Sequence, residues 1–418
     1  MTEPVGALRA DTTREDSGPL LLCPAEDVAN PEVSIVIPAL NEELTVGEFV
    51  EWCKQGLQKA NVRGEILIVD SSDDRTAEVA REHGARVLRV PRRGLGRAYI
   101  DAIPYIRGRY VLMGDADCTY DFREIEPFLA RFRAGYEYVM GSRFRGFIEP
   151  DSMPGLHRYL GTPVTTFLLN LIYGTRFSDI HCGMRGVSLD ALRRMDLASQ
   201  SWEYASEMVL KSVQMGLRTA EVPVRFLRDR EGRQSHHKRA GWLSPWKAAW
   251  INLEAMFENG ADFFLFRPGL VLLAIGAAMV LAASTGPVSI GPVTISIYWS
   301  LLGLTLAVVG LQSFYLGCLA RVLYDRTGRN VARWTARFPY TRTCLLAAGL
   351  LLSGLGLAWP LVHEYRDSGL RLSSVLDSAK HLAITGLFCI ISAFMTFTFL
   401  LVFRALAAYV TRTTQNRG

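Results

Sequence analysis

Apolar and polar residues follow two different patterns along the 418-residue chain. Between residues 33 and about 235, short apolar runs typical of buried strands alternate with segments of helical periodicity. From Phe263 onward there are four long apolar stretches, at about 268–285, 297–320, 343–362 and 382–403. Each approaches or exceeds the ~20 residues that cross a bilayer as a helix. The pattern predicts an α/β domain with a mostly parallel, Rossmann-like sheet and flanking helices, followed by an all-α membrane domain of four transmembrane helices.

These patterns also predict the domain boundaries. Residues 1–30 have no periodicity and no basic start followed by an apolar core, so they indicate a disordered leader and not a secretory signal. A segment with Trp242, Trp246 and Trp250 among basic residues indicates an interfacial helix, with helical core packing as the alternative. The predicted order is leader (1–30), α/β domain (31–240), interfacial amphipathic region (241–266), four-helix membrane domain (267–410) and cytoplasmic tail (411–418).

The loops predict the orientation in the membrane. The first connection, from Ser284 to Ile295, has no charge, whereas the second has a single acid, Asp325, among six arginines. Those arginines are Arg321, Arg326, Arg329, Arg333, Arg337 and Arg342. Because positive loops stay in the cytoplasm, we expect a multi-pass protein of the cell membrane with its catalytic domain and C-terminus inside.

Charge and cysteine usage narrow the class of protein further. The formal net charge is +5, and much of the excess lies beside the membrane, where anionic lipid is the natural partner. The seven cysteines form no CxxC pair, which suits a reducing cytoplasm. There is no zinc-ligand spacing and no nucleic-acid module, so no nucleic-acid partner is expected. A homo-oligomer is compatible with these features.

Acidic side chains follow the strand-like run Tyr110–Met113. Asp115 and Asp117 are two residues apart, so they can present two carboxylates toward one point just past the strand. Mg²⁺ and Mn²⁺ are commonly held by one or two carboxylates together with diphosphate oxygens. A simple turn is the alternative, since Asp is frequent after strands.

Two further apolar runs end in the same way. The run at residues 33–37 stops at Pro38, and we expect the acidic cluster that follows, with Asn41 and Glu42, to open an amphipathic helix. The run 65–69 ends at Asp70. Ligands of open α/β sheets bind outside the carboxyl ends of the strands, where these polar residues gather.

The ordered set Pro-x-x-Asn-Glu, strand-Asp, Gly-x-Gly-x-Ala and Asp-x-Asp resembles the family 2 inverting glycosyltransferases of GT-A fold. Within that family it is most similar to the polyprenyl-phosphate sugar synthases of the dolichol-phosphate mannose or glucose synthase type, over about residues 33–240. The resemblance implies a hexosyltransferase that moves a hexose from UDP-glucose or GDP-mannose to a polyprenyl phosphate at the cytoplasmic membrane face. It also implies a divalent cation, Mg²⁺ or Mn²⁺.

The resemblance assigns roles to the donor half. It implies that Asp70 meets the base or ribose, and that Asp115 and Asp117 hold the metal and diphosphate, with Asp117 catalytic. The Gly94–Gly96 loop lies over the donor, or alternatively makes a tight turn before a helix. Asp121 is either a third metal ligand or the N-cap of a helix from Phe122. The residues that line the nucleoside are Pro38, Ala39, Asn41 and Glu42.

In the acceptor half, the resemblance implies that Arg143 and Arg158 meet the lipid phosphate, beside an apolar helix from Val164 to Tyr173. Asp179 positions the acceptor or sugar, and Arg185 could instead pair with acids in the core. The remaining assignments are Glu207 near the sugar, with a salt bridge as its alternative, and Arg230 and Ser235 in a loop that could close over the donor.

Two other functions compete with this interpretation. A processive polysaccharide synthase carries Gln-x-x-Arg-Trp beside its catalytic domain, but the nearest string here, Asn330 to Trp334, has the wrong first residue and lies between later spans. A transporter or scaffold with a noncatalytic head is disfavoured by the intact acids and arginines, Asp115, Asp117, Arg143 and Arg158.

Overall fold

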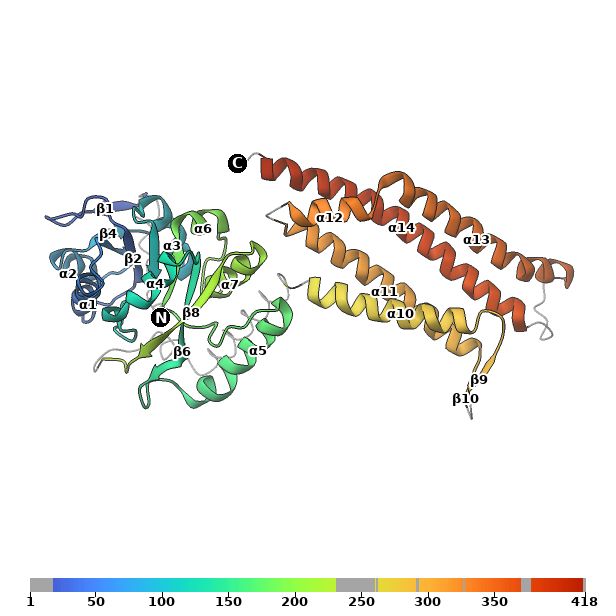
Figure 1. Cartoon of the computed structure of the whole chain (residues 1–418), viewed down its shortest axis with the longest axis horizontal. Helices are drawn as coiled ribbons and strands as arrows, with labels where there is room; N and C mark the ends of the chain where they lie inside the picture. Colours follow the sequence, from blue (N-terminus) through green and yellow to red (C-terminus); the bar gives the residue numbers. More distant parts are fainter. Residues whose placement is uncertain are drawn as a thin grey trace, which may run out of the picture. The chain divides into compact units, whose positions relative to one another are not determined.

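The computed structural model describes residues 18–230, 260, 262–290, 293–325, 328–369 and 377–415. The chain divides into two compact units, Met1–Met256 and Phe257–Gly418 (Figure 1). The predicted interfacial region 241–266 lies outside the described residues, apart from residue 260 and η4 (Asp262–Phe266).

The first unit is built on an eight-stranded mixed sheet. Its strands are β1 (Leu20–Leu22), β2 (Val33–Ala39), β3 (Gly64–Asp70), β4 (Arg86–Arg89), β5 (Tyr110–Met113), β6 (Tyr138–Ile148), β7 (Arg185–Ser188) and β8 (Thr219–Phe226), in the order β1-β4-β3-β2-β5-β7-β6-β8. β1 and β7 are antiparallel to their neighbours, and every other pairing is parallel. This is the Rossmann-like arrangement that the apolar runs predict.

Helices flank the sheet (Figure 1). They are α1 (Val46–Lys59), α2 (Thr76–Glu82), α3 (Leu95–Ala102), α4 (Glu126–Arg133), α5 (Thr162–Tyr173), α6 (Leu189–Met195) and α7 (Tyr204–Gln214), with the short turns η1 (Ile103–Tyr105), η2 (Phe122–Glu124) and η3 (His157–Gly161). The central strands β2, β3 and β5 are buried almost throughout, as expected for strands covered on both faces. Phe49 of α1 packs edge-on against Phe122, with ring centroids 5.0 Å apart.

The predicted disordered leader is wrong over its last part. Leu20–Leu22 forms β1, which pairs antiparallel with β4 at the edge of the sheet. Asp27 then accepts two hydrogen bonds from the guanidinium of Arg107, at 2.7 and 3.0 Å. A three-residue strand is too short to show periodicity, so the sequence pattern could not reveal it.

The amphipathic helix expected at Asn41 and Glu42 is present but begins later than predicted. β2 continues through Pro38 to Ala39, and α1 begins at Val46. Asn41 lies between them with φ +57°, a left-handed conformation that Asn tolerates better than most residues. The free N–H groups at the start of α1 therefore lie several residues beyond the position predicted.

The second unit is helical. It contains α10 (Arg267–Ala282), a hairpin of β9 (Val288–Ile290) and β10 (Val293–Ile295), α11 (Ile297–Leu323), α12 (Arg329–Arg337), α13 (Tyr340–Asp367) and α14 (Asp377–Gln415). Four helices in the described residues are long and apolar enough to cross a membrane: Phe263–Ala282, Ile297–Leu323, Tyr340–Asp367 and Ser378–Arg412. They coincide with the four predicted stretches. The hairpin and α12 were not predicted.

Candidate active site

The two acids after β5 lie beside a second loop of the domain. β5 ends at Met113, so Asp115 and Asp117 occupy the turn that follows and not the strand itself. The Oδ1 atom of Asp117 accepts hydrogen bonds from the backbone N–H and hydroxyl of Thr119, at 3.0 and 2.6 Å. A Cβ on Gly183 would lie only 2.6 Å from the Oδ2 atom of Asp115. A side chain at position 183 would therefore displace the Asp115 carboxylate.

Asp121 has the structural role that the sequence offered as an alternative. Its carboxylate caps η2 by accepting from the backbone N–H of Arg123 at 3.2 Å, and it pairs with the guanidinium of Arg123 at 2.7 and 2.8 Å. Among the described residues, no three His, Cys, Asp or Glu side chains gather as a metal site. Two neighbouring carboxylates are a donor set that Mg²⁺ or Mn²⁺ accepts together with substrate oxygens, and the assignment of Asp115 and Asp117 to the metal stays a prediction.

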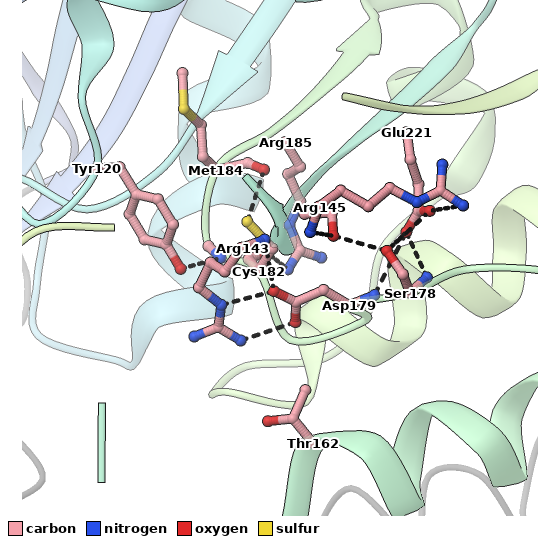
Figure 2. Close-up of polar contacts among 12 residues, drawn as sticks. Tyr120, Arg143, Arg145, Thr162, Ser178, Asp179, Cys182, Met184, Arg185 and Glu221 are labelled. Atoms are coloured by element: carbon pink, nitrogen blue, oxygen red, sulfur yellow. Dashed lines mark hydrogen bonds and ion pairs between the residues drawn. The ribbon is translucent and has the colours of Figure 1, made fainter. Parts of the chain in front are cut away.

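Arg143 and Asp179 form a buried ion pair at the end of β6 (Figure 2). The Nε and Nη2 atoms of Arg143 donate to the two carboxylate oxygens at 2.7 and 2.8 Å, and the backbone N–H of Arg143 adds a third bond at 3.1 Å. Burial opposes ionisation of Asp179, but the charge and hydrogen bonds of Arg143 outweigh it and hold the pKa of Asp179 below its ordinary value. The pair fixes a cationic group in place, with the guanidinium carbon of Arg143 5.3 Å from the ring centroid of Phe226.

Glu221 of β8 holds the segment that carries Asp179 (Figure 2). Its carboxylate accepts from the backbone N–H of Ser178 at 2.6 Å and pairs with Arg145 at 3.1 Å. The Ser178 hydroxyl also lies 2.7 Å from that of Ser142 on β6. Sequence reasoning missed Glu221, because an acid on the polar face of an alternating strand reads as solvent-facing, whereas this side chain is 4% exposed.

Tyr120 connects the Asp115 region to this pair. Its hydroxyl accepts a hydrogen bond from the backbone N–H of Gly183 at 2.8 Å (Figure 2). The Tyr120 ring is buried, and burial raises the pKa of its phenol. No sequence signal identifies Tyr120, since one aromatic residue after a turn is more often core than site. The loop around residue 183 therefore joins the predicted metal and phosphate halves.

Arg158 lies on η3, directly before α5. Its guanidinium carbon is 5.6 Å from the ring centroid of Tyr159. Both Arg158 and Arg143 are cationic donors, so the two side chains can act together only through a shared anion. α5 is nevertheless tied to the Asp179 segment, because the hydroxyl of Thr165 lies 2.9 Å from the Nε2 atom of His181. Burial lowers the pKa of His181 to about 4, so this histidine is neutral at physiological pH.

One side of η3 and α5 exposes large apolar side chains. Tyr159 is 76% exposed and Phe167 is 64% exposed. The other exposed apolar residues are Leu156, Leu160, Val164 and Leu171, which with Phe167 recur every three or four residues. This spacing places them on one helical face. We call the five residues with this spacing, Leu156, Leu160, Val164, Phe167 and Leu171, the α5 apolar face.

The donor-side residues meet where β2 and β3 end side by side, with Ala39 opposite Asp70. Asn41 donates its backbone N–H to Ser72 at 2.8 Å and accepts from the backbone N–H of Asp73 at 3.0 Å. Asp70 is fully buried, and burial raises its pKa. Its Oδ2 atom has no hydrogen bond to any residue that the structure describes and lies 3.4 Å from the Nε atom of Arg89.

Glu42 belongs to the same corner, since its backbone N–H donates to the hydroxyl of Thr76 at 2.9 Å and its carboxylate accepts from Thr45 at 3.1 Å. Pro38 lies next to the last residue of β2 and is half-buried. Asn41 and Glu42 therefore connect the loop after β2 to the loop after β3, which contains Ser72 and Asp73.

The two glycines before α3 are required by close packing. A Cβ on Gly94 would clash with the carbonyl oxygen of Gln200, and one on Gly96 would clash with that of Ser199. The loop that covers them is held by Glu207, which accepts from the backbone N–H of Ser199 at 2.9 Å and pairs with Lys211. The salt bridge expected as the alternative role of Glu207 is therefore confirmed. Gly96 and Glu207 both contact Ser199, so they lie on opposite sides of the same loop residue.

Three further predictions concern Arg185, Arg230 and Ser235. The guanidinium of Arg185 donates to the carbonyl oxygens of Cys182 and Ala205, and its pairing with core acids stays a prediction. Arg230 pairs with Glu48 of α1 and lies 5.3 Å above the ring of Trp52. Ser235 lies outside the described residues.

Comparison with known proteins identifies the chain. Residues 34–196 match the family described as glycosyl transferase family 2, and residues 318–407 match the glycosyltransferase family 2 C-terminal transmembrane region. The low-salt glycan biosynthesis hexosyltransferase Agl6 of Haloferax volcanii is 36% identical over 84% of this chain and 84% of its own length. The chain belongs to glycosyltransferase family 2.

Other relatives match about half of this chain. The dolichyl-phosphate hexose transferase of Haloferax volcanii is 29% identical over 48% of this chain and 85% of its own length. A crystal structure of glucosyl-3-phosphoglycerate synthase from Mycobacterium tuberculosis, in complex with Mn²⁺, UDP and phosphoglyceric acid, aligns with a TM-score of 0.42 and 20% identity, covering 55% of this chain and 78% of that one.

The family 2 assignment combines with the helices of the second unit. The matched transmembrane region runs from α11 to α14 and contains three of the four candidate spans in whole or in part. This family 2 chain is therefore a multi-pass membrane glycosyltransferase, with a GT-A domain followed by a helical membrane domain.

Proposed function

We propose that this glycosyltransferase transfers a hexose from a nucleotide sugar, UDP-glucose or GDP-mannose, to a polyprenyl phosphate at the cytoplasmic face of the membrane. The observation that carries the proposal is the α5 apolar face beside Arg158, tied through Thr165 and His181 to the segment that holds the Arg143–Asp179 pair. An acceptor with a phosphate head and a hydrocarbon chain needs a cationic group for the phosphate and an apolar surface for the chain, next to each other.

On the donor side, Asp115 and Asp117 are the residues that would hold Mg²⁺ or Mn²⁺ together with the donor diphosphate. A bound divalent cation would neutralise the charge that develops on the leaving nucleoside diphosphate. Asn41, Glu42 and Asp70 would contact the nucleoside, since they gather where β2 and β3 end. Ligands of open α/β sheets bind at this edge.

On the acceptor side, the nucleophile does not require a protein base. The second pKa of a phosphate monoester is about 6, so the acceptor is already largely an oxyanion at neutral pH. The site must instead hold that oxyanion in line with the anomeric carbon. Arg158 and Arg143 would hold that oxyanion, and the α5 apolar face would accompany the prenyl chain.

Two further observations support the lipid acceptor and the cytoplasmic side. One relative, matched over 85% of its own length, is named a dolichyl-phosphate hexose transferase. The arginine-rich connection between the second and third spans favours a cytoplasmic location for that end of the bundle.

The test is product formation by the purified full chain in lipid nanodiscs. Each of UDP-glucose and GDP-mannose is supplied with polyprenyl phosphate and Mg²⁺ or Mn²⁺, and lipid products are identified by mass spectrometry. We expect one donor to give a polyprenyl-phosphate hexose. Hydrolysis of the donor without a lipid product, or extension to a polymer, would contradict the proposal.

A further inference from the structure

The helix between the second and third spans has two sides of opposite chemistry. α12 carries Arg329, Arg333 and Arg337 at four-residue spacing, and all three are exposed. Residues four apart lie on the same face of a helix. The three guanidinium groups therefore form one basic face, which we call the α12 arginine face.

The other side of α12 is fixed to the helical bundle. Trp334 is 4% exposed, and its ring packs against Phe266 and Phe338 at centroid distances of 5.7 and 5.8 Å. Val331 packs on the same aromatic cluster, and its backbone N–H donates to Asp325 at 2.8 Å. α12 contacts α11 and α14 (Figure 1) and packs on them through its apolar side, whereas the residues of the α12 arginine face are exposed.

The flanking helices set the depth of α12 in the membrane. α11 ends at Leu323 and α13 begins at Tyr340, and both are candidate spans, so these two ends emerge at the same bilayer surface. α12 has 9 residues, too few to cross a bilayer. Its buried Trp334 and outward arginines suit a helix that lies at the level of the lipid headgroups.

We propose that the α12 arginine face binds the phosphate groups of anionic phospholipids at this surface. Arginine binds phosphate through paired, charge-assisted hydrogen bonds, and anionic leaflets attract basic residues beside membrane spans. The charge is unbalanced in the sequence, since residues 321–342 contain six arginines and one acid, Asp325. This function goes beyond sugar transfer and does not depend on it.

The test measures lipid selectivity of the full chain reconstituted in phosphatidylcholine vesicles. Spin-labelled phosphatidylglycerol and spin-labelled phosphatidylcholine report the ratio of their association constants with the protein. We expect the unmodified protein to prefer phosphatidylglycerol, with a preference that falls as NaCl is raised. In the triple variant R329Q/R333Q/R337Q, that ratio should fall at least ~3-fold.

Two control variants isolate the face. R329K/R333K/R337K keeps the charge and should keep most of the preference. R81Q/R131Q/R193Q removes three exposed arginines from the first unit and should leave the ratio unchanged. An unchanged ratio in R329Q/R333Q/R337Q, or an equal fall in the first-unit control, would overturn the proposal. Inorganic phosphate and NaCl are also compared at equal ionic strength. If phosphate displaces more labelled lipid than NaCl does, the site binds free phosphate and the proposal is overturned.

Discussion

At the scale of single residues, Asp117→Asn removes the negative charge of the side chain and keeps its size. The amide oxygen can still accept the two hydrogen bonds from Thr119, so the turn after β5 should persist. The negative charge that would hold a divalent cation is lost, and such cations stabilise a leaving diphosphate by several kcal/mol. We expect turnover to fall at least ~100-fold while the unfolding temperature of the protein stays near that of the parent. Near-normal turnover, or full activity of the parent in EDTA, would contradict the metal assignment.

Arg158→Ala should weaken acceptor use at least ~10-fold, about the loss of one charge-assisted contact, with little change in donor binding. Arg143→Ala should do the same but should also reduce stability, because it leaves Asp179 buried without its cation. Arg145→Ala is the matched control, since Arg145 is exposed and pairs with Glu221 on the neighbouring strand. The measurement is the KM for polyprenyl phosphate and for the nucleotide sugar, and indifference of both arginine variants to acceptor would count against the assignment.

Asp179→Asn tests the buried ion pair itself. Removing one partner of such a pair typically costs about 3–5 kcal/mol, because the other charge stays buried and uncompensated. The folded-state pKa of Asp179 is depressed, so its contribution is present at neutral pH and is lost only as the pH falls below the ordinary range of a carboxyl. The free energy of unfolding should therefore differ between the parent and the variant at pH 7. Below about pH 4 the difference should shrink, because Asp179 of the parent becomes protonated. Equal stability of the two at pH 7 would disprove the role.

The sequence predicted residue positions better than residue partners. Acids and glycines at strand ends stand out in the chain, and Asp115, Asp70 and Gly94 lie where that pattern indicates. Their partners come from distant segments: Glu221 reaches Ser178 and Tyr120 reaches Gly183. Such contacts depend on the packing of several elements, which no local pattern encodes. The roles of the candidate residues in catalysis stay predictions.

At the scale of elements, the α5 apolar face should matter for a lipid acceptor and not for a soluble donor. Phe167→Asp places a charge on that face and removes apolar area worth about 1.5–3 kcal/mol when buried. The KM for polyprenyl phosphate should rise at least ~10-fold, with the donor KM unchanged. Leu44→Asp is the matched control, because Leu44 is 77% exposed and lies outside η3 and α5. Equal effects of the two variants would show that the face has no special role.

Element type was predictable wherever an apolar run was long or strongly periodic. The strands β2, β3 and β5 and the four candidate spans fall where the runs predict. The short elements were not predictable. β1 has three residues and depends on its pairing with β4, and α12 depends on Trp334 packing into the aromatic cluster. Pro38 reads as a strand end locally, yet pairing with β3 carries β2 one residue further.

At the scale of the whole molecule, the orientation in the membrane follows from the loops. Single cysteines at Gly328 and at Ser368, in a background without the seven native cysteines, lie in the second and third connections. Because the second connection is rich in arginine, we expect a membrane-impermeant label applied to intact cells to miss residue 328 and to reach residue 368. Labelling with the opposite pattern would place the arginine-rich end outside and contradict a cytoplasmic catalytic domain.

The identity of the acceptor nucleophile is tested most directly by comparing polyprenyl phosphate with the free polyprenol of the same chain length. The full chain in nanodiscs receives the preferred nucleotide sugar and each acceptor in turn, and the initial rates of lipid glycosylation are measured. A phosphate oxyanion needs cations and no base, so we predict rapid transfer to the phosphate and little or none to the alcohol. Equal rates with the two acceptors would contradict a site built around Arg143 and Arg158 for a lipid phosphate.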